Sequence, residues 1–431
     1  MSLLSFDEAL QKLLAAARPV TEIEEVDTVA AVGRVLARAQ ASGLTVPPLD
    51  NSAMDGYAVR LADVAAAGTR LPVSQRIPAG SVGTPLAAGT AARIFTGAPV
   101  PEGADAVVMQ ELCEHAGEGV VQVNHAPHPG ENIRRAGEDI RAGDAILAAG
   151  TRLAPQDIGL AASVGLAVLP VFRRLRVAVF FTGDELSMPG EALRPGGIYN
   201  SNRYTLRGLF AALGCEVRDL GIVPDSLEAT RAALREAAAS SDVIVTSGGV
   251  SVGEEDHVKA AVEAEGALDL WKIAIKPGKP LAFGKVSRRG TAQASGIPPA
   301  PFPGKGVTEA RGQGPLENEA AFIGLPGNPV STFVTFLVLV RPFLLACQGA
   351  GAALPRGLAM RADFDWPKPD RRREFLRVRI NAAGGLDLFP NQSSGVLTSC
   401  AWADGLVDNP PGQAVARGDP VRFLPLSELL Y

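Results

Sequence analysis

The segment RVAVFFTG, residues 176–183, is a continuous apolar run that ends in a glycine turn. Strands buried on both faces of a parallel sheet have this composition, whereas half-exposed strands alternate apolar and polar residues. Helix-like and strand-like segments then alternate in the order YNSNRYTLRGLFAALGC, EVRDLGIV, DSLEATRAALREAAASS and DVIVTSGG. This alternation predicts an α/β fold, with a central doubly wound domain and a mostly parallel sheet.

The predicted α/β domain covers residues 173–348. It continues through a helix in HVKAAVEAE, strands in LWKIAI and PLAFGK, and a last strand and long apolar helix in AFIGLPGNPVSTFVTFLVLVRPFLLACQG. Residues 286–320 interrupt it with a stretch rich in Gly, Pro and Ala that has no periodic apolar face. Such a composition predicts a flexible insertion.

The flanking regions differ in pattern from the central domain. Residues 1–172 are expected to form an N-terminal region that is helical over 1–45 and 141–172, with a β-rich insertion over about 46–140. The first helical range rests on the spacing of seven apolar residues: Leu10, Leu13, Leu14, Val29, Val32, Val35 and Leu36. Residues 349–431, with RADFDW, EFLRVRI, LDLFP and PVRFLP, predict a small C-terminal β domain.

Composition limits the classes of function. The 431 residues carry a net charge of −5, which argues against nucleic-acid binding through overall positive charge. The N-terminus has acids where a signal peptide is apolar, and the longest apolar segment, FVTFLVLVRPFLLAC, is interrupted by Arg341-Pro342. That segment is shorter than a membrane span, so no membrane association and a cytoplasmic location are expected.

The cysteines and histidines give no clear metal motif. The four cysteines are far apart, without a CxxC pair, which is typical of free thiols in an intracellular protein. Cys113, His115, His125 and His128 lie within sixteen residues, but their spacing matches no standard zinc finger. A surface loop is the favoured interpretation, and no zinc site is predicted.

Four glycine-containing turns are predicted at the carboxyl ends of parallel strands, where open α/β sheets bind ligands. They are FTGDE (181–185), GIVPD (221–225), TSGG (246–249) and GLPGNP (324–329). Glycines allow a ligand to approach the backbone, and free N–H groups at helix starts favour oxyanions. Glu185, Asp225 and Asp256 would end near the same crevice, where carboxylates beside phosphate oxygens suit Mg²⁺. Alternatively, these are ordinary turns of an α/β domain, with acids that complement helix dipoles.

A basic segment, WKIAIKPGKP (271–280), includes most of the predicted strand LWKIAI and a proline–glycine turn after it. On one extended strand Lys272 and Lys276 would point to the same face and, with Lys279, line an oxyanion site. An exposed basic edge is the equally weighted alternative. Neither GxGxxG nor GxxxxGK[ST] is present, so neither a dinucleotide fold nor a P-loop is indicated.

Long motifs resemble those of the molybdopterin molybdenumtransferase family, which includes bacterial MoeA proteins and the C-terminal E domain of gephyrin. They are DNSAMDGYAVR (50–60), RIFTGAPVPEGADAVVMQE (93–111), NIRRAGEDI (132–140), FTGDEL, TSGGVSVGEEDHVK, WKIAIKPGKP and GLPGNPVS. They occur in family order over about residues 5–345, and RRREFLR and NQSSGVLTS extend the likeness less closely. The chain departs from the family pattern at Phe181, at Ser393 and in the long 286–320 insertion.

The resemblance implies Mg²⁺-dependent insertion of molybdate into adenylylated molybdopterin with release of AMP, by a homodimer whose cleft combines domains of two subunits. It also suggests the molybdopterin adenylyltransferase as a candidate partner. The implied catalytic residues are Asp55, Asp139, Glu185, Asp256, Lys272 and Lys276. Metal ligands would be Glu185, Asp225 and Asp256. The substrate-binding positions, partly from the turns and partly from the motifs, are Thr96, Thr182, Gly183, Ser247, Gly248, Gly249, Lys279, Pro326, Asn328, Arg372 and Ser394.

Two other functions remain open at this level. An adenylyltransferase acting one step earlier would resemble the α/β domain alone, and the MDGYA and GEDI motifs argue against it. A non-enzymatic scaffold, as in gephyrin, would not need the acids and lysines that the chain retains.

Overall fold

The computed structural model describes residues 3–249, 257–288, 318–351 and 354–430. Its central element is a six-stranded sheet in the order β16 (Glu216–Val223), β13 (Arg176–Thr182), β17 (Val243–Ser247), β21 (Glu319–Leu325), β20 (Pro280–Ser287) and β18 (Gly266–Lys272). The first four strands are parallel, and β20 and β18 are antiparallel to their neighbours. The predicted insertion of residues 286–320 begins within β20 and ends within β21, and its residues 289–317 lie outside the described part of the chain.

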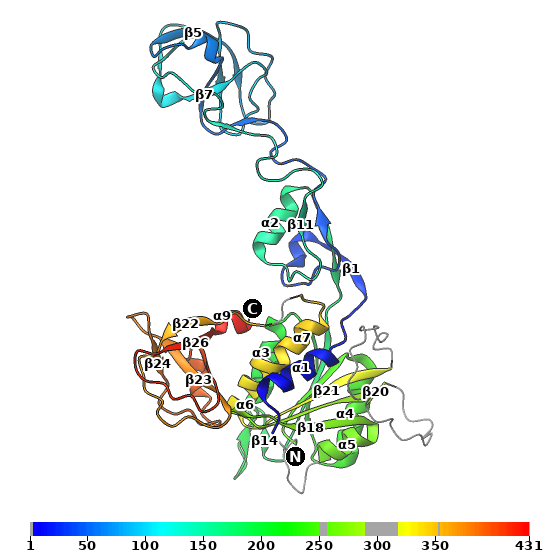
Figure 1. Ribbon diagram of the computed structural model, residues 1–431. Coiled ribbons are helices and arrows are strands. Elements are labelled where there is room, and N and C mark those ends of the chain that lie inside the picture. The colour runs from blue at the N-terminus through cyan, green and yellow to red at the C-terminus, as the bar shows by residue number, and fades with distance from the viewer. Residues whose placement is uncertain (1–2, 250–256, 289–317, 352–353, 431) are drawn as a thin grey trace, which may run out of the picture.

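Helices cover both faces of this sheet, so it is doubly wound (Figure 1). On one face pack α1 (Phe6–Ala16), α3 (Ser201–Ala212), α6 (Pro329–Thr335), a π-helical turn (Phe336–Val340) and α7 (Arg341–Cys347). On the other face pack α4 (Leu227–Ser240) and α5 (His257–Glu265). Successive residues of β13 alternate between the two cores: Val179 and Phe181 belong to the first, and Ala178 and Phe180 to the second. Phe181, one of the departures from the family pattern, is therefore a core residue.

The run Pro329–Cys347 is the one helix in the described residues that is long and apolar enough to cross a membrane. It is longer than the interrupted segment suggested, because Arg341 and Pro342 do not break it. Of its apolar window, 89% is buried inside the protein, where it packs as the core helix of the α/β domain.

The N-terminal region contains far less helix than its apolar spacing predicted. Only α1 and α2 (Pro155–Ser163) are α-helical, and α1 packs against α7 of the α/β domain. The rest of the region contains short paired strands: β1 (Ile23–Asp27) with β12 (Val168–Phe172), β2 (Gln40–Ala41) with β11 (Ala145–Leu147), and β3 (Asn51–Ser52) with β10 (Ile133–Arg134). One 3-10 turn, Thr28–Ala31, follows β1.

The prediction of helix over 1–45 is therefore wrong beyond Ala16, and over 141–172 it is wrong outside α2. Val29 and Val32 are exposed, whereas Val35 and Leu36 are buried because they form β-bridges to Arg152 and Val171. The apolar spacing fits a helix, but long-range strand pairing fixes the backbone instead.

The middle of the N-terminal region is β-rich, as its alternating runs indicated. Its six-stranded sheet has the order β7 (Ala106–Met109), β4 (Gly56–Val59), β6 (Ala91–Ile94), β5 (Thr69–Ile77), β9 (Val120–Val123) and β8 (Cys113–His115). Short 3-10 helices at Leu61–Asp63 and Gln110–Leu112 connect some of these strands. Figure 1 shows this sheet at the opposite end of an elongated molecule from the α/β domain.

The C-terminal region forms a further sheet in the order β19 (Ile275–Lys276), β23 (Arg373–Ile380), β25 (Gly405–Asn409), β26 (Pro420–Pro425) and β22 (Leu358–Arg361), with β24 (Leu386–Leu388) beside β23. Two short helices, α8 (Thr398–Trp402) and α9 (Leu426–Leu430), complete it. Strand β19 comes from the α/β part of the chain and pairs in parallel with β23, so one backbone segment belongs to both parts.

Candidate functional site

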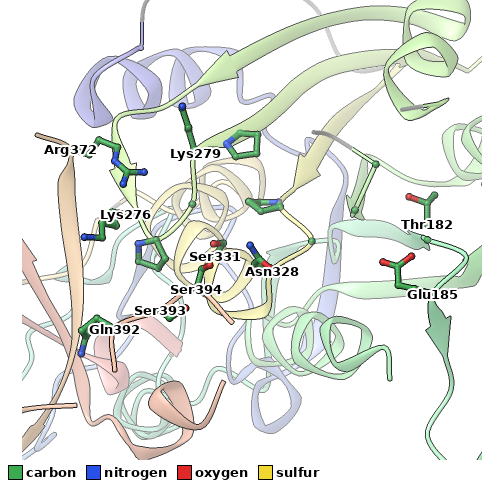
Figure 2. A pocket seen from close by; sticks show the side chains of 18 of the residues that line it. Thr182, Glu185, Lys276, Lys279, Asn328, Ser331, Arg372, Gln392, Ser393 and Ser394 are labelled. Atoms are coloured by element: carbon green, nitrogen blue, oxygen red, sulfur yellow. The ribbon is translucent and has the colours of Figure 1, made fainter. Parts of the chain in front are cut away.

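A cavity of about 650 Å³ lies between the α/β domain and the C-terminal sheet (Figure 2). Its floor consists of turns that follow β13, β17 and β21, and its opposite wall of the segment 276–280 and two C-terminal loops. It is lined by Thr182, Gly183, Glu185, Asp225, Gly248, Gly249, Lys276, Pro277, Gly278, Lys279, Pro280, Pro326, Gly327, Asn328, Ser331, Arg372, Gln392, Ser393 and Ser394. Twelve of the predicted functional residues are in this set, brought together from seven separate stretches of sequence.

The floor requires glycine at two adjacent positions. Gly248 and Gly249 have φ values of +99° and +64°, in the region that favours glycine. A Cβ on Gly248 would lie 2.6 Å from the carbonyl oxygen of Thr182, and one on Gly249 would lie 2.8 Å from Thr182 Oγ1. The two glycines therefore leave room for the backbone of the neighbouring strand and for whatever enters the cavity.

Carboxylates occupy one end of the cavity. Glu185 follows β13 and folds back over Gly183, whose added Cβ would be 2.6 Å from Glu185 Oε2. Asp225 follows β16, immediately before the N-cap Ser226 of α4. Both line the same cavity. Asp256 lies outside the described residues, and within those no three acidic, histidine or cysteine side chains are grouped as metal ligands.

Cations occupy the opposite wall, where Figure 2 shows Lys276, Lys279 and Arg372 across the cavity from Thr182 and Glu185. Lys276 Nζ is 3.1 Å from Glu374 Oε1 and 3.6 Å from Asp370 Oδ2. Hydrogen bonds from the Arg372 side chain hold the pKa of Asp370 well below its usual value. Two of the three cations of this wall, Lys276 and Arg372, are thus already paired with acids of the C-terminal sheet and its preceding loop.

Lys272 and Lys276 do not share one extended strand, contrary to the prediction. Lys272 ends β18 of the α/β sheet, and its carbonyl oxygen accepts a hydrogen bond from Leu4 N. Lys276 lies in β19 of the C-terminal sheet and lines the cavity, which Lys272 does not. Two residues, Ile273 and Ala274, redirect the chain from one sheet to the other.

The loop 392–394 is fixed by a buried arginine. Arg377, 1% exposed, exchanges backbone hydrogen bonds with the Gln392 side chain: its N–H donates to Oε1, and its carbonyl oxygen accepts from Nε2. Its guanidinium donates to the carbonyl oxygen of Ser393, and burial lowers its pKa to about 10. The carbonyl oxygen of Ser394 in turn accepts from Val330 N at the start of α6. The loop therefore lines the cavity in one defined conformation.

Ser247 supports the site from below. Its buried hydroxyl donates to the carbonyl oxygen of Pro326 and accepts from Asn202 Nδ2. Asn202 also donates to the carbonyl oxygen of Gly327, which joins the turns after β17 and β21. Ser247 lines a second, adjoining cavity of about 520 Å³ that shares Thr182 and Glu185 with the first.

Three predicted residues lie in the N-terminal region and not at the cavity. Asp55 Oδ1 accepts hydrogen bonds from both N and Oγ1 of Thr96 at 2.8 Å, and these bonds lower the pKa of this exposed acid. Asp139, between β10 and β11, donates its backbone N–H to the carbonyl oxygen of Val46, between β2 and β3. The resemblance grouped these three residues with the cavity residues. Within one chain, however, Asp55 and Thr96 adjoin strands β4 and β6 of the sheet at the far end of the molecule, and Asp139 lies between β10 and β11 (Figure 1).

Ser331, Gln392 and Ser393 line the cavity without having been predicted as site residues. Ser331 lies on α6 and is the last residue of the motif GLPGNPVS, so the motif contained it although no role was assigned to it. Gln392 and Ser393 reach the cavity only because the C-terminal sheet packs there, and no local pattern signals that packing.

Comparisons with known proteins find the same family over successive parts of the chain. Three family models match: MoeA N-terminal region (domain I and II) over residues 4–165, probable molybdopterin binding domain over 178–346, and MoeA C-terminal region (domain IV) over 359–426. The molybdopterin molybdenumtransferase of Haemophilus influenzae is 41% identical over 383 residues, which cover 89% of this chain and 84% of that protein. That of a Nostoc species is 35% identical, over 94% of this chain and 89% of its own.

Solved structures show the same fold. The molybdopterin biosynthesis MoeA protein of Pyrococcus horikoshii superposes with a TM-score of 0.79 at 27% identity, covering 98% of this chain and 100% of its own. Gephyrin of Dictyostelium discoideum is 31% identical over 91% of this chain but only 57% of its own length. On this agreement of sequence and structure, the chain belongs to the molybdopterin molybdenumtransferase family of molybdenum cofactor biosynthesis enzymes.

Proposed function

We propose that this enzyme inserts molybdate into adenylylated molybdopterin and releases AMP, with the cavity between the α/β domain and the C-terminal sheet as its active site. The observation that carries the proposal is the division of that cavity into a carboxylate end and a basic wall across a glycine floor. A phosphorylated nucleotide ester and a dianionic oxyanion need such different surroundings in one place.

Each part of the cavity has a role in this proposal. Lys276, Lys279 and Arg372 attract molybdate and hold it, since fixed cations stabilise a dianion where water is partly excluded. The glycine turns at Gly183, Gly248 and Gly249 allow the phosphate to approach the backbone, with Thr182, Ser247, Pro326, Asn328 and Ser394 shaping the remaining contact surface.

The carboxylates at the other end fit a hard divalent cation. Glu185 and Asp225 line the cavity from adjacent turns, and Asp256 is the proposed third ligand. Bound Mg²⁺ would neutralise charge on the phosphoanhydride during its hydrolysis. The protein side chains supply the position of the ligands and the shape of the cavity around the phosphate.

We also propose a homodimer in the cytoplasm. Asp55, Thr96 and Asp139 do not line the cavity of their own chain. They adjoin β4, β6 and β10–β11, in the N-terminal region that extends away from the α/β domain (Figure 1). A second subunit could bring them to it, as the family resemblance implies, and Lys272 would act from beside that shared cleft.

Turnover by the purified chain tests the function. We expect AMP release and formation of molybdenum cofactor from adenylylated molybdopterin, molybdate and Mg²⁺. Lys276→Gln is expected to lower the rate by about a hundredfold or more, as loss of one charge-stabilising donor does. Lys285→Gln is the matched control, because Lys285 on β20 forms a similar ion pair with Glu319 on β21, outside the cavity.

The alternative functions give other results. An adenylyltransferase would consume ATP and molybdopterin and would not release AMP from the adenylylated substrate. A scaffold protein would neither consume ATP and molybdopterin nor release AMP from the adenylylated substrate. If the wild type fails to release AMP while it is folded and Mg²⁺ is present, the proposed function is wrong.

A further inference from the structure

The basic wall of the cavity already holds an internal anion. Asp370 Oδ2 is 2.8 Å from Arg372 Nη2 and 3.6 Å from Lys276 Nζ, so it lies between the two cations. Its other oxygen accepts from Arg372 Nε at 3.0 Å and from the Arg372 backbone N–H at 3.1 Å. Asp370 itself is not among the residues that line the cavity. The Asp370 carboxylate therefore pairs with Lys276 and Arg372 from outside the cavity lining, and these are the cations that an entering oxyanion must bind.

The second acid at this wall is built into the fold. Glu374 is fully buried on β23 and accepts from Trp366 Nε1 at 2.7 Å, from the Asp370 backbone N–H at 3.1 Å and from Lys276. Its removal would leave Trp366 Nε1 and the Asp370 backbone N–H without this acceptor and would take from Lys276 its closer ion-pair partner. Asp370, in contrast, precedes the strand, is partly exposed, and accepts in the described structure from Arg372 alone, with Lys276 beside it.

The charge balance determines what this arrangement does. Lys276 and Arg372 supply two positive charges, and Asp370 and Glu374 supply two negative charges, so this four-residue cluster is nearly neutral as folded. Lys279 adds one further positive charge to the basic wall. An oxyanion gains little binding energy from cations that are already neutralised by acids. It binds well only if it replaces one of the acids as the partner of Lys276 and Arg372. A doubly charged oxyanion can compete with a single carboxylate, whereas a monoanion such as chloride offers no more charge than Asp370 does.

We propose that Asp370 is a specificity-determining residue: an internal competitor that sets the affinity of the basic wall for oxyanions and favours dianions over monoanions. This inference rests on the proposed function, because it assigns molybdate to the same wall. When molybdate enters, Arg372 and Lys276 turn part of their hydrogen bonding from Asp370 to the oxyanion, and Glu374 stays in place.

The test is molybdate binding to the full-length protein by calorimetry at constant ionic strength, without the pterin substrate. We expect Asp370→Asn to bind molybdate about tenfold more tightly than the wild type, a change of about 1.4 kcal/mol. We also expect chloride to compete more strongly with molybdate in this variant. Asp370→Ser removes the same charge and should give the same gain, whereas Asp370→Glu keeps the charge and should bind as the wild type does.

A matched control exists in the same domain. Asp363 forms the same fork with an arginine two residues away, since Arg361 Nε and Nη2 donate to its two carboxylate oxygens at 2.8 and 3.0 Å. It does not line the cavity or lie beside Lys276. Asp363→Asn therefore removes an equivalent ion pair and is expected to leave molybdate binding unchanged. Adding Lys276→Gln to Asp370→Asn should abolish the gain.

Opposite results would overturn the inference. If Asp370 only positions Arg372, then Asp370→Asn and Asp370→Ser will bind molybdate more weakly than the wild type, or equally. An equal gain in Asp363→Asn would indicate a general effect of net charge. Failure of the proposed function appears elsewhere, as absence of AMP release by the wild type, so the two failures are distinguishable.

Discussion

At the scale of single residues, the shape of the cavity depends on the absence of one side chain. Gly248→Ala would place a methyl group 2.6 Å from the carbonyl oxygen of Thr182, in a backbone conformation with φ of +99°. Because that oxygen belongs to strand β13, the turn must move. We expect a loss of about 2–3 kcal/mol in the free energy of unfolding. We also expect a large loss of AMP release. Chemical denaturation measures the change in stability, and a turnover assay measures the change in AMP release.

Gly384→Ala separates the clash from the strain of the backbone. Gly384 has φ of +73°, but an added Cβ there meets nothing within 4 Å. This substitution should cost about 1 kcal/mol and leave activity unchanged. Equal losses in the two variants would show that the cavity floor does not depend on the close approach of Gly248 to Thr182.

Which site residues the sequence can predict depends on how each one reaches the cavity. Thr182, Gly248 and Asn328 follow strands of the parallel sheet, and the carboxyl ends of such strands meet at one edge whatever the details of packing. Gln392 reaches the same cavity through its contact with buried Arg377 in another sheet. That contact fixes the loop within the C-terminal region, but the loop lines the cavity only because this region docks on the α/β domain, which no spacing in the sequence encodes.

At the scale of secondary structure, long-range pairing overrode local spacing twice. Val35 and Leu36 have helical spacing but form β-bridges to residues more than 100 positions away. Lys272 and Lys276 look like one strand but belong to two sheets, because β19 pairs with β23. The α/β alternation was predictable because each of its strands and helices carries its own apolar pattern.

A buried acid connects the amino ends of the sheet strands. Asp242 precedes β17, is 2% exposed, and accepts from Arg173 Nη1 and Nη2, Arg176 N and Arg288 Nη2. Burial alone would raise the pKa of Asp242, but the hydrogen bonds from Arg173 and from the Arg176 backbone outweigh it and lower the pKa. The charged form of this acid therefore stabilises the fold.

The sign of this shift gives a pH-dependent prediction. The folded pKa lies below the unfolded value of about 3.9, so the stabilisation is fully present above about pH 4 and is lost as the pH falls through the folded pKa. Asp242→Asn should cost about 3 kcal/mol at neutral pH, because it removes the buried charge that pairs with the partly buried side chains of Arg173 and Arg288. Its unfolding free energy should fall less steeply between pH 4 and pH 2 than that of the wild type.

Glu216→Gln is the control for that comparison. Glu216 is 3.5 Å from Arg176 Nε at the start of neighbouring β16, and both side chains are about half exposed or more. An exposed pair of this kind contributes at most about 0.5 kcal/mol. Urea denaturation of the three proteins across this pH range measures the difference, and a wild-type acid slope in Asp242→Asn would contradict the role given to Asp242.

At the scale of the whole molecule, elongation separates two groups of residues that the proposed chemistry needs together. The cavity with Lys276 lies between the α/β and C-terminal parts, and Asp55 with Thr96 lies on the distant β-rich sheet (Figure 1). If both groups act on one substrate, each active site must combine two chains. Asp55→Asn and Lys276→Gln should then each inactivate the enzyme for different reasons, while light scattering still shows dimers.

Mixing the two inactive variants makes the shared site testable. Random assembly of co-expressed Asp55→Asn and Lys276→Gln chains gives about half heterodimers, as expected for a two-fold symmetric pair. In each heterodimer one site combines the intact cavity of the first chain with the intact Asp55 of the second, and the other site carries both defects. About a quarter of wild-type activity should therefore return, measured as AMP release per chain.

If every site were built within one chain, each would carry a defect and the mixture would stay inactive. Co-expression of Asp55→Asn with Thr96→Val provides the control, since both changes lie on the same sheet and no combination of subunits can restore a complete site.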